Sequence, residues 1–461
     1  MSKGTLAHRI ELLEEQLAAA LEGNGPNAPQ EPLKLPYVTD QTFSHLSTRK
    51  SNLTGVVRFL TLGYANKEDS TYLGPSSGLS LAENVNQIVH RGVGTKLLPV
   101  HAGQYSDAVR DEDAGAKASP PDDEISSRIL DVYFKNMHAR LPFLDRSEIL
   151  ELHAERHQPP GKTPEEQFGK FKMFMVYAIG AAILQTTETY NSTPPSDFLL
   201  TALCFDPTLR ESISVASVEA MVLIVIYNLR TNSNSSVWYM IGLAMRTCVD
   251  FGFHRKARYA KLNAHESEKR RRLFWTVYIM ERHTACSLGR PFSIAEEEID
   301  AELPSNLDDS IADDEMITQI LKGECRTERT PIPTLGRFIA SIQLQRIVSE
   351  INTRIYRLDK QSSSLISEIA PLMEKLEAFK INVPSLDLQD CDFVYMHWNN
   401  SVQILLQPFL SVLHPQDGYI RTCLFASGQM CQIFKTLRQR DSCGHSFLLM
   451  NSVFMAGLTM W

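Results

Sequence analysis

The amino-acid sequence predicts an all-α fold, in which a multi-helix domain follows a short coiled coil and a largely irregular linker. Apolar residues recur at helical spacings of three and four through most of the chain after Ile125, and no stretch alternates as a half-buried strand would. Segments such as Ala220–Tyr227 are apolar on every side, which indicates burial among several helices. The chain has 461 residues, of which 43% are hydrophobic and 22% charged, so it is long enough for two or more globular domains.

The first predicted element is a helix over residues 5–22, inside a predicted domain of residues 1–22. Its apolar stripe consists of Leu6, Ile10, Leu13, Leu17 and Leu21, at the spacings of a coiled coil. A lone helix of this length is marginal in water, so we expect it to pair with a second chain, as a homodimer or a heterodimer. Packing against its own chain is the alternative, but the Gly/Pro/Asn-rich stretch Gly23–Pro32 separates the helix from any nearby core.

Residues 23–124 are predicted to be a linker of low order. Turn-forming residues are frequent in it, as in Tyr72–Ser80 (YLGPSSGLS), and residues 106–124 are charged and contain serine and proline.

Residues 125–461 are predicted to form the helical domain. Ile125, Ile129 and Tyr133 share one helical face, and Thr163–Glu166 is a capping box with proline at the first helical position, which opens a helix through about Thr186. Further helices are expected at 195–204, 215–230, 236–251, 266–287, 335–358, 364–380, 391–412, 417–439 and 444–461.

Composition excludes several classes of protein. A formal charge of −8, from 46 basic and 54 acidic residues, argues against broad binding to nucleic-acid phosphates. None of the eight cysteines forms a Cys-x-x-Cys pair, so we expect no zinc site and no cofactor in this chain, and a reducing intracellular environment. The longest apolar run, Phe171–Leu184, is 14 residues long, which is too short to cross a bilayer, so we expect a soluble protein without a membrane partner.

The basic run Lys269–Arg272 has two interpretations. It could be a nuclear localisation signal or a phosphate contact. The sequence favours internal ion pairs, because Glu266 and Glu268 each precede an arginine by four residues, and because the run continues directly into apolar residues that must be buried. The helix is expected to end at Gly289, with Pro291 beyond it.

These residues carry a family resemblance. An arginine-rich helix with two aromatic residues is followed by Leu288–Pro291 and then by Ile299–Pro304 (IDAELP), and this order resembles the fungal-specific transcription factor domain, the middle homology region of zinc-cluster transcription factors. The signature residues are Arg270, Arg271, Arg272, Phe274, Trp275, Gly289, Arg290, Pro291, Asp300 and Pro304. Tyr72–Leu81, Tyr133–Ile149 and Trp238–Arg255 also resemble family segments, so the likeness covers roughly 70–455.

The resemblance implies a nuclear regulatory body that controls RNA polymerase II transcription through dimerisation and through sensing of a small-molecule effector or a partner, with the transcription machinery as a further partner. In this family a coiled coil commonly follows the zinc cluster and sets the geometry of the dimer on DNA. The six cluster cysteines are missing here, so the sequence predicts DNA contact only through a missing or partner zinc cluster, and zinc only if an upstream cluster exists.

Either the cluster was lost or the sequence begins after it, and the uncapped end of Ser446–Trp461 raises the same question at the other terminus. The alternative function is a free-standing interaction protein that forms inhibitory mixed dimers with a full-length relative.

No catalytic residue is predicted. His153 and His157 are one helical turn apart and could hold a metal, but the intervening glutamate is not placed as in metalloproteases and Pro159 ends the segment, so a solvated helix end is favoured. Gly74–Gly78 lacks the spacing of a nucleophile elbow. We therefore expect a protein that is not an enzyme.

Overall fold

The computed structural model describes residues 74, 76–77, 118–159, 161–187, 190–205, 214–231, 237–322, 335–383, 391–439 and 446–460. Within these residues the chain forms thirteen α-helices and no strand, so the predicted all-α class is confirmed there. The coiled coil predicted for residues 1–22 and nearly all of the linker predicted for 23–124 lie outside the described residues, and both remain predictions. No helix in the described ranges is long and apolar enough to cross a membrane.

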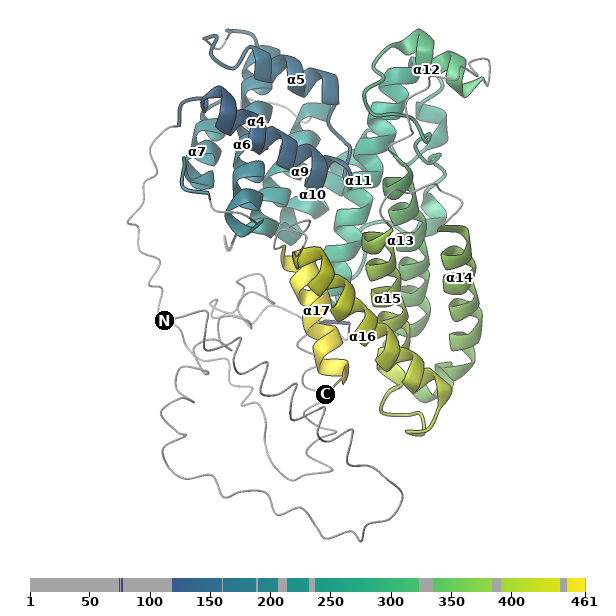
Figure 1. Ribbon diagram of the computed structural model, residues 1–461. Coiled ribbons are helices and arrows are strands. Elements are labelled where there is room, and N and C mark those ends of the chain that lie inside the picture. Colours follow the sequence, from purple (N-terminus) through teal and green to yellow (C-terminus); the bar gives the residue numbers. More distant parts are fainter. Residues whose placement is uncertain are drawn as a thin grey trace, which may run out of the picture. The chain divides into compact units, whose positions relative to one another are not determined.

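The first group of helices surrounds α6 (Pro164–Thr187), which packs against α4 (Asp123–Tyr133), α5 (Arg146–Ala154), α7 (Pro195–Cys204) and α9 (Val215–Arg230) (Figure 1). Every residue from Phe168 to Leu184 is buried, including Lys170 and Lys172, because this stretch is otherwise apolar on all sides. The neighbouring α9 is buried from Ser217 to Leu229 and packs in turn on α10 (Val237–Asp250). Together these helices form most of the largest apolar core.

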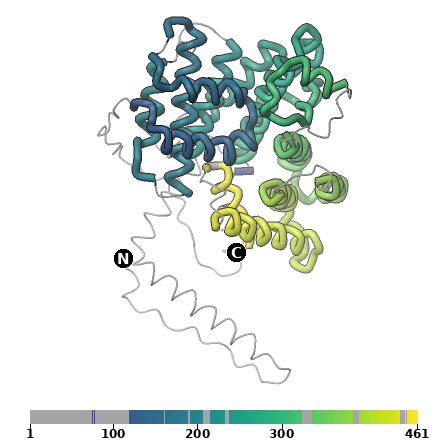
Figure 2. Tube along the Cα trace, turned by 45° about the horizontal axis from the view of Figure 1, so that its top comes forward, coloured from purple at the N-terminus to yellow at the C-terminus, as the bar shows by residue number. Residues whose placement is uncertain are grey.

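The next helix, α11 (Ala264–Leu288), lies between this core and the rest of the chain. It contacts α9 and α10 on one side and α13 (Gly336–Ile355) on the other. A second apolar core is formed by α13, α14 (Ile369–Asn382) and α15 (Asp392–Leu406), and α16 (Gly418–Gln439) packs on α15 and on α17 (Phe447–Met460) (Figure 2). The remaining short helical segments are α12 (Asp314–Leu321), η3 (Phe134–His138), η4 (Lys256–Arg258), η5 (Glu296–Glu298), η6 (Ser362–Glu368) and η8 (Gln407–Phe409).

The structure corrects several predicted boundaries. No range was predicted for the helix α5, although a helix end was expected near His153, because only Ile149 in it is buried and its periodicity is correspondingly weak. The eight-residue α12 was missed because it is only about two turns long, although its apolar residues Met316, Ile317, Ile320 and Leu321 recur at helical spacing. The helix predicted for 391–412 ends at Leu406 and continues as the 3-10 segment η8, where Pro408 lacks the amide that a continuing α-helix needs.

Candidate functional site

The helix α11 positions the predicted signature. The side chain of Asn263 caps its start by accepting a hydrogen bond of 2.8 Å from the backbone amide of Glu266. Gly289 ends the helix with φ of 64°, a left-handed conformation in which glycine has no steric penalty. The amide of Arg290 then donates to the carbonyl of Ala285 at 2.9 Å. The predicted end at Gly289 is therefore confirmed.

The basic run at the start of α11 makes internal ion pairs. Arg270 Nε lies 2.6 Å from Glu266 Oε1, as predicted. Glu268, however, pairs with Arg271 at 2.7 Å and not with Arg272 as expected, because its side chain turns toward the residue three positions away and also accepts hydrogen bonds from Ser305. The signature arginine Arg272 is only 5% exposed, so its guanidinium is not available for contact with a phosphate.

The two signature aromatic residues belong to the main core. Phe274 and Trp275 are fully buried, with ring centroids 5.2 Å apart in an edge-to-face arrangement. The indole Nε1 of Trp275 donates to the backbone carbonyl of Glu302 at 2.9 Å. This bond attaches residues 299–304, which include the signature residues Asp300 and Pro304, to α11.

The Asp300 carboxylate holds the loop that follows α10. It accepts hydrogen bonds from both Nε and Nη2 of Arg255, at 3.0 and 3.1 Å, and from the amide of Lys256 at 2.7 Å. The hydrogen bonds from Lys256 and from Arg255 lower the pKa of Asp300. Pro304 is buried farther along the same segment. The family signature thus joins α10, α11 and the 299–304 segment by structural contacts and not by reactive groups.

A buried ion pair between Glu281 and Arg282 lies at the other end of α11. The side chain of Arg282 is completely buried and contacts Glu281 at 2.7 Å and the carbonyl of Ile294 at 2.7 Å. Its Nε donates to Ser349 on α13 at 3.1 Å. Two adjacent charged residues within an apolar helical run are the feature of the sequence that could have predicted this ion pair, since charges are rarely buried unless they are paired.

The end of α11 also contacts Gly74 and Ser76, which lie in the region that the sequence analysis expected to be a linker. The amide of Gly74 donates to the carbonyl of Leu288 at 2.9 Å, and the hydroxyl of Ser76 donates to the carbonyl of Cys286 at 2.9 Å. The backbones of Gly74 and Gly289 approach so closely that a Cβ atom on either would overlap the other. Beside this contact, the Arg290 guanidinium stacks 4.6 Å from the ring centroid of Trp238, and Pro291 is exposed.

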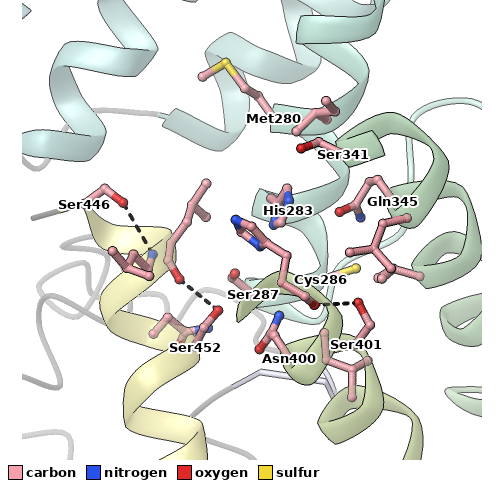
Figure 3. Close-up of a pocket in the computed structure, with 18 of the residues that line it drawn as sticks. Met280, His283, Cys286, Ser287, Ser341, Gln345, Asn400, Ser401, Ser446 and Ser452 are labelled. Carbon is pink, nitrogen blue, oxygen red and sulfur yellow. Dashed lines mark hydrogen bonds between the residues drawn. The ribbon is translucent and has the colours of Figure 1, made fainter. Parts of the chain in front are cut away.

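A cavity of about 170 Å³ lies beside this junction, between α11, α13, α15 and α17 (Figure 3). His283 on α11 and His397 on α15 line it side by side and pack edge to face on each other, with ring centroids 5.3 Å apart. The ring of Phe393 meets His397 at 4.4 Å, and the guanidinium carbon of Arg140 lies 3.8 Å from the Phe393 centroid.

Both cavity histidines are neutral at pH 7. Burial lowers the pKa of His283 to about 4. Burial also lowers the pKa of His397 well below its usual value, and the neighbouring His283 and Arg140 lower it further. Each ring keeps partial exposure toward the cavity, although protein atoms surround it on the remaining sides.

Three buried amide side chains at the cavity wall have an atom without a hydrogen-bond partner among the described residues. These atoms are Gln345 Nε2, Gln403 Oε1 and Asn451 Oδ1. The residues are 3%, 1% and 6% exposed, so water does not reach them from the outer surface. Such groups are uncommon in folded proteins, and three around one cavity make part of its wall polar.

The other predicted sites have different outcomes. The dimerisation residues Leu6, Ile10, Leu13, Leu17 and Leu21 lie outside the described residues. His153 Nδ1 lies 2.8 Å from the hydroxyl of Tyr177, whereas His157 is exposed beyond the end of α5, so the two do not face one another on a helix. Among the described residues no group of three potential metal ligands is present. Sequence reasoning missed the cavity, because its walls come from helices far apart in the chain.

Residues 130–400 match the fungal-specific transcription factor domain. Over 369 residues the chain is 28% identical to an uncharacterized transcriptional regulatory protein of Saccharomyces cerevisiae, covering 73% of this chain and 27% of that protein. It is also 22% identical over 413 residues to the positive regulator of purine utilization of Emericella nidulans, covering 72% of this chain and 38% of the relative.

A third relative, the pyrimidine pathway regulatory protein 1 of Saccharomyces cerevisiae, is 28% identical over 251 residues, which are 52% of this chain and 27% of that protein. The chain thus matches about a quarter to two fifths of the length of these three relatives. No solved structure matches the chain. Because the domain match covers more than half of its length, the chain belongs to the fungal-specific transcription factor domain family, whose members are transcription regulators and not enzymes.

Proposed function

We propose that the chain is the effector-responsive body of a fungal transcription factor, which acts in the nucleus and controls RNA polymerase II transcription. The position of the cavity supports this proposal. Its walls combine Ser76 from the N-terminal part of the chain, His283 from the signature helix and Asn451 from α17, which follows the matched family region. A ligand in the cavity would contact all three parts at once.

The contacts of Gly74 and Ser76 would link the cavity to the N-terminal part of the chain. Ser76 lines the cavity and also donates its hydroxyl proton to the carbonyl of Cys286. Gly74, two residues earlier, is anchored on Leu288. A ligand that contacts the cavity therefore strengthens or displaces the attachment of these residues, and a ligand shifts an equilibrium only through such a difference in affinity.

The test is a transcription reporter driven by the full chain fused to a heterologous DNA-binding domain. Ser287→Phe and Asn400→Phe each place an aromatic ring in the cavity, so we expect reporter output to change at least about threefold at equal protein level. Ser196→Phe, at an exposed position of α7, is the matched control and should leave the output unchanged. Wild-type output from both cavity variants would contradict the proposal.

We also propose that two chains pair through the N-terminal helix, and that DNA is reached through a zinc cluster carried elsewhere or by a partner. The stripe from Leu6 to Leu21 supports pairing, because its spacing is that of a coiled coil. Sedimentation of the chain with and without residues 1–22 tests this. We expect a dimer only with residues 1–22, and a monomer in both cases at micromolar concentration would remove the proposal.

The alternative proposal, an inhibitory mixed dimer, predicts that adding the chain weakens DNA binding by a full-length zinc-cluster relative. Absence of a Cys-x2-Cys-x6-Cys motif from the genomic sequence upstream of Met1 would favour it. A gel-shift titration separates the two proposals, because an effector-responsive body that does not pair with the relative leaves its DNA binding unchanged.

A further inference from the structure

We propose that the cavity binds an uncharged molecule of about ten non-hydrogen atoms, which carries a hydrogen-bond acceptor and a donor on a compact apolar body, as an aromatic carboxamide does. The inference rests on the proposed function and specifies the chemistry of the effector. The observations that support it are the buried amide atoms without partners, the state of the ionisable groups at the wall and the size of the space.

The buried amides at the wall supply both kinds of hydrogen-bonding group. Gln345 on α13 is 3% exposed, and its Nε2 is a donor without a partner among the described residues. Figure 3 shows the terminal amide of this side chain pointing toward His283. Gln403 on α15 and Asn451 on α17 each keep a buried carbonyl oxygen without a partner in the described part of the chain. The wall therefore offers one donor and two acceptors to a ligand.

A ligand that pairs with these atoms gains affinity. An unpaired polar atom in a buried site has lost its hydrogen bonds to water without replacement, and the ligand supplies the missing partner. The carbonyl oxygen of a carboxamide can accept from Gln345 Nε2, and its N–H group can donate to the oxygen of Gln403 or of Asn451. A purely apolar molecule of the same size leaves all three atoms without a partner, so we expect it to bind more weakly.

The ionisable groups that line the cavity favour an uncharged ligand. The described lining residues include no aspartate or glutamate, so a cation finds no counter-ion among them. His283 and His397 are neutral at pH 7, because burial lowers the pKa of each. The two arginines at the wall, Arg140 and Arg230, already have interaction partners in the protein. An ion that enters this space therefore gives up its hydration without gaining a counter-ion of its own, which is costly in a buried site.

The size of the space limits the ligand. A cavity of roughly 150 Å³ holds benzene. At about 170 Å³, this one admits a single six-membered ring with one small polar group. Much of the remaining wall is apolar, with Met280, Leu344, Val348 and Leu449 among the lining residues. A nucleotide or a long fatty acid does not fit without rearrangement of the helices.

The test compares benzamide with three probes of nearly the same size and shape, using the full chain. Acetophenone keeps the carbonyl acceptor but lacks the donor, benzoate is an anion and benzamidinium is a cation. Isothermal titration at pH 7 should show benzamide binding about fivefold more tightly than acetophenone, the gain expected for one neutral hydrogen bond. Benzoate and benzamidinium should each bind at least about tenfold more weakly than benzamide, because each brings an unpaired charge into the cavity. Hydrogen exchange in residues 446–460 should slow with benzamide, because α17 forms part of the wall.

Two variants locate the site. Gln345→Leu removes the donor, so benzamide and acetophenone should both bind about fivefold more weakly, because each loses the hydrogen bond to its carbonyl oxygen. The melting temperature of this variant should not fall, because Nε2 has no partner to lose among the described residues. Ser287→Phe places a ring in the cavity and should abolish the binding of every probe. Gln432→Leu, at an exposed position of α16, is the matched control and should leave all affinities unchanged.

The outcomes separate this inference from the proposed function. Benzoate or benzamidinium that binds as tightly as benzamide overturns the preference for an uncharged ligand, and acetophenone that does so overturns the need for a donor. Benzamide binding that Gln345→Leu leaves intact overturns the assigned hydrogen bond, and no binding by any probe overturns the whole inference. The comparison among probes needs no variant, so it decides the chemistry even if Gln345→Leu folds poorly. The proposed function is decided separately, by the reporter output of Ser287→Phe and Asn400→Phe, which needs no ligand to be known.

Discussion

Replacing Gly74 by alanine tests the attachment of the N-terminal segment to α11. The amide of Gly74 donates to Leu288, and its Cα stands against the backbone of Gly289. An added Cβ would overlap the Gly289 carbonyl, and both partners in this contact are backbone atoms that cannot rotate away. The segment must therefore leave its site, and the hydrogen bond from Ser76 to Cys286 is lost with it.

The magnitude follows from these contacts. Two hydrogen bonds at about 0.5–1.5 kcal/mol each give a loss of about 1–3 kcal/mol in the free energy of unfolding for Gly74→Ala. Gly289→Ala breaks the same contact and also places alanine at φ of 64°, which adds about 1–2 kcal/mol. We therefore expect Gly289→Ala to be the more destabilising of the two.

Hydrogen exchange and urea unfolding are the assays. Peptides that contain residues 74–77 should lose their protection in both variants. Gly457→Ala is the matched control, because a Cβ there meets nothing within 4 Å and alanine favours the helix by about 1 kcal/mol over glycine. Retained protection of residues 74–77 in Gly74→Ala would refute the reasoning.

Three other predictions concern α11. Arg282→Met leaves Glu281 buried without its ion-pair partner and should cost about 3–5 kcal/mol of unfolding free energy, measured in urea. His283 has a folded-state pKa of about 4, below its usual value of 6.5, so the stability it contributes is present above pH 6.5 and is lost as the pH falls toward 4, by about 3 kcal/mol. His283→Gln should flatten the pH dependence of stability in that range. Trp275→Phe removes the hydrogen bond to Glu302 and part of a buried ring, and should cost about 1–3 kcal/mol.

Exposed substitutions are the controls for these three variants. Arg357→Met, at a surface ion pair, should change stability by less than about 1 kcal/mol. A similarly small effect of Arg282→Met would mean that the buried pair contributes little. An unchanged acid profile in His283→Gln would show that other groups determine the pH dependence, and full stability of Trp275→Phe would contradict the role of its indole.

The helical content could be predicted because it depends on local patterns. The helices 195–204 and 215–230 were placed without error, and α10 and α16 to within one residue at each end. Proline, glycine and polar caps fix such boundaries through neighbouring residues. The short α5 and α12 were missed, because α5 has little apolar periodicity and α12 is only eight residues long.

The signature arginines show that the partner of an ion pair cannot be predicted from helical spacing alone. Spacing along a helix allows Glu268 to pair with either Arg271 or Arg272, and the sequence favoured the latter. The structure selects Arg271, since Arg272 is drawn into the protein interior while Arg271 also reaches Glu302 at 2.9 Å. The burial of a side chain depends on what other elements cover it, and that information is not local.

The sequence by itself determined the helical class, the family and the absence of a Cys-x-x-Cys zinc pair, because periodicity, motif order and residue identity are properties of the chain. Only the tertiary structure decided that Gly74 lies against Gly289 and that His283 packs on His397. These partners are separated by more than a hundred residues, so no spacing rule connects them. A cavity exists only where distant helices pack incompletely, and packing is a property of the folded chain.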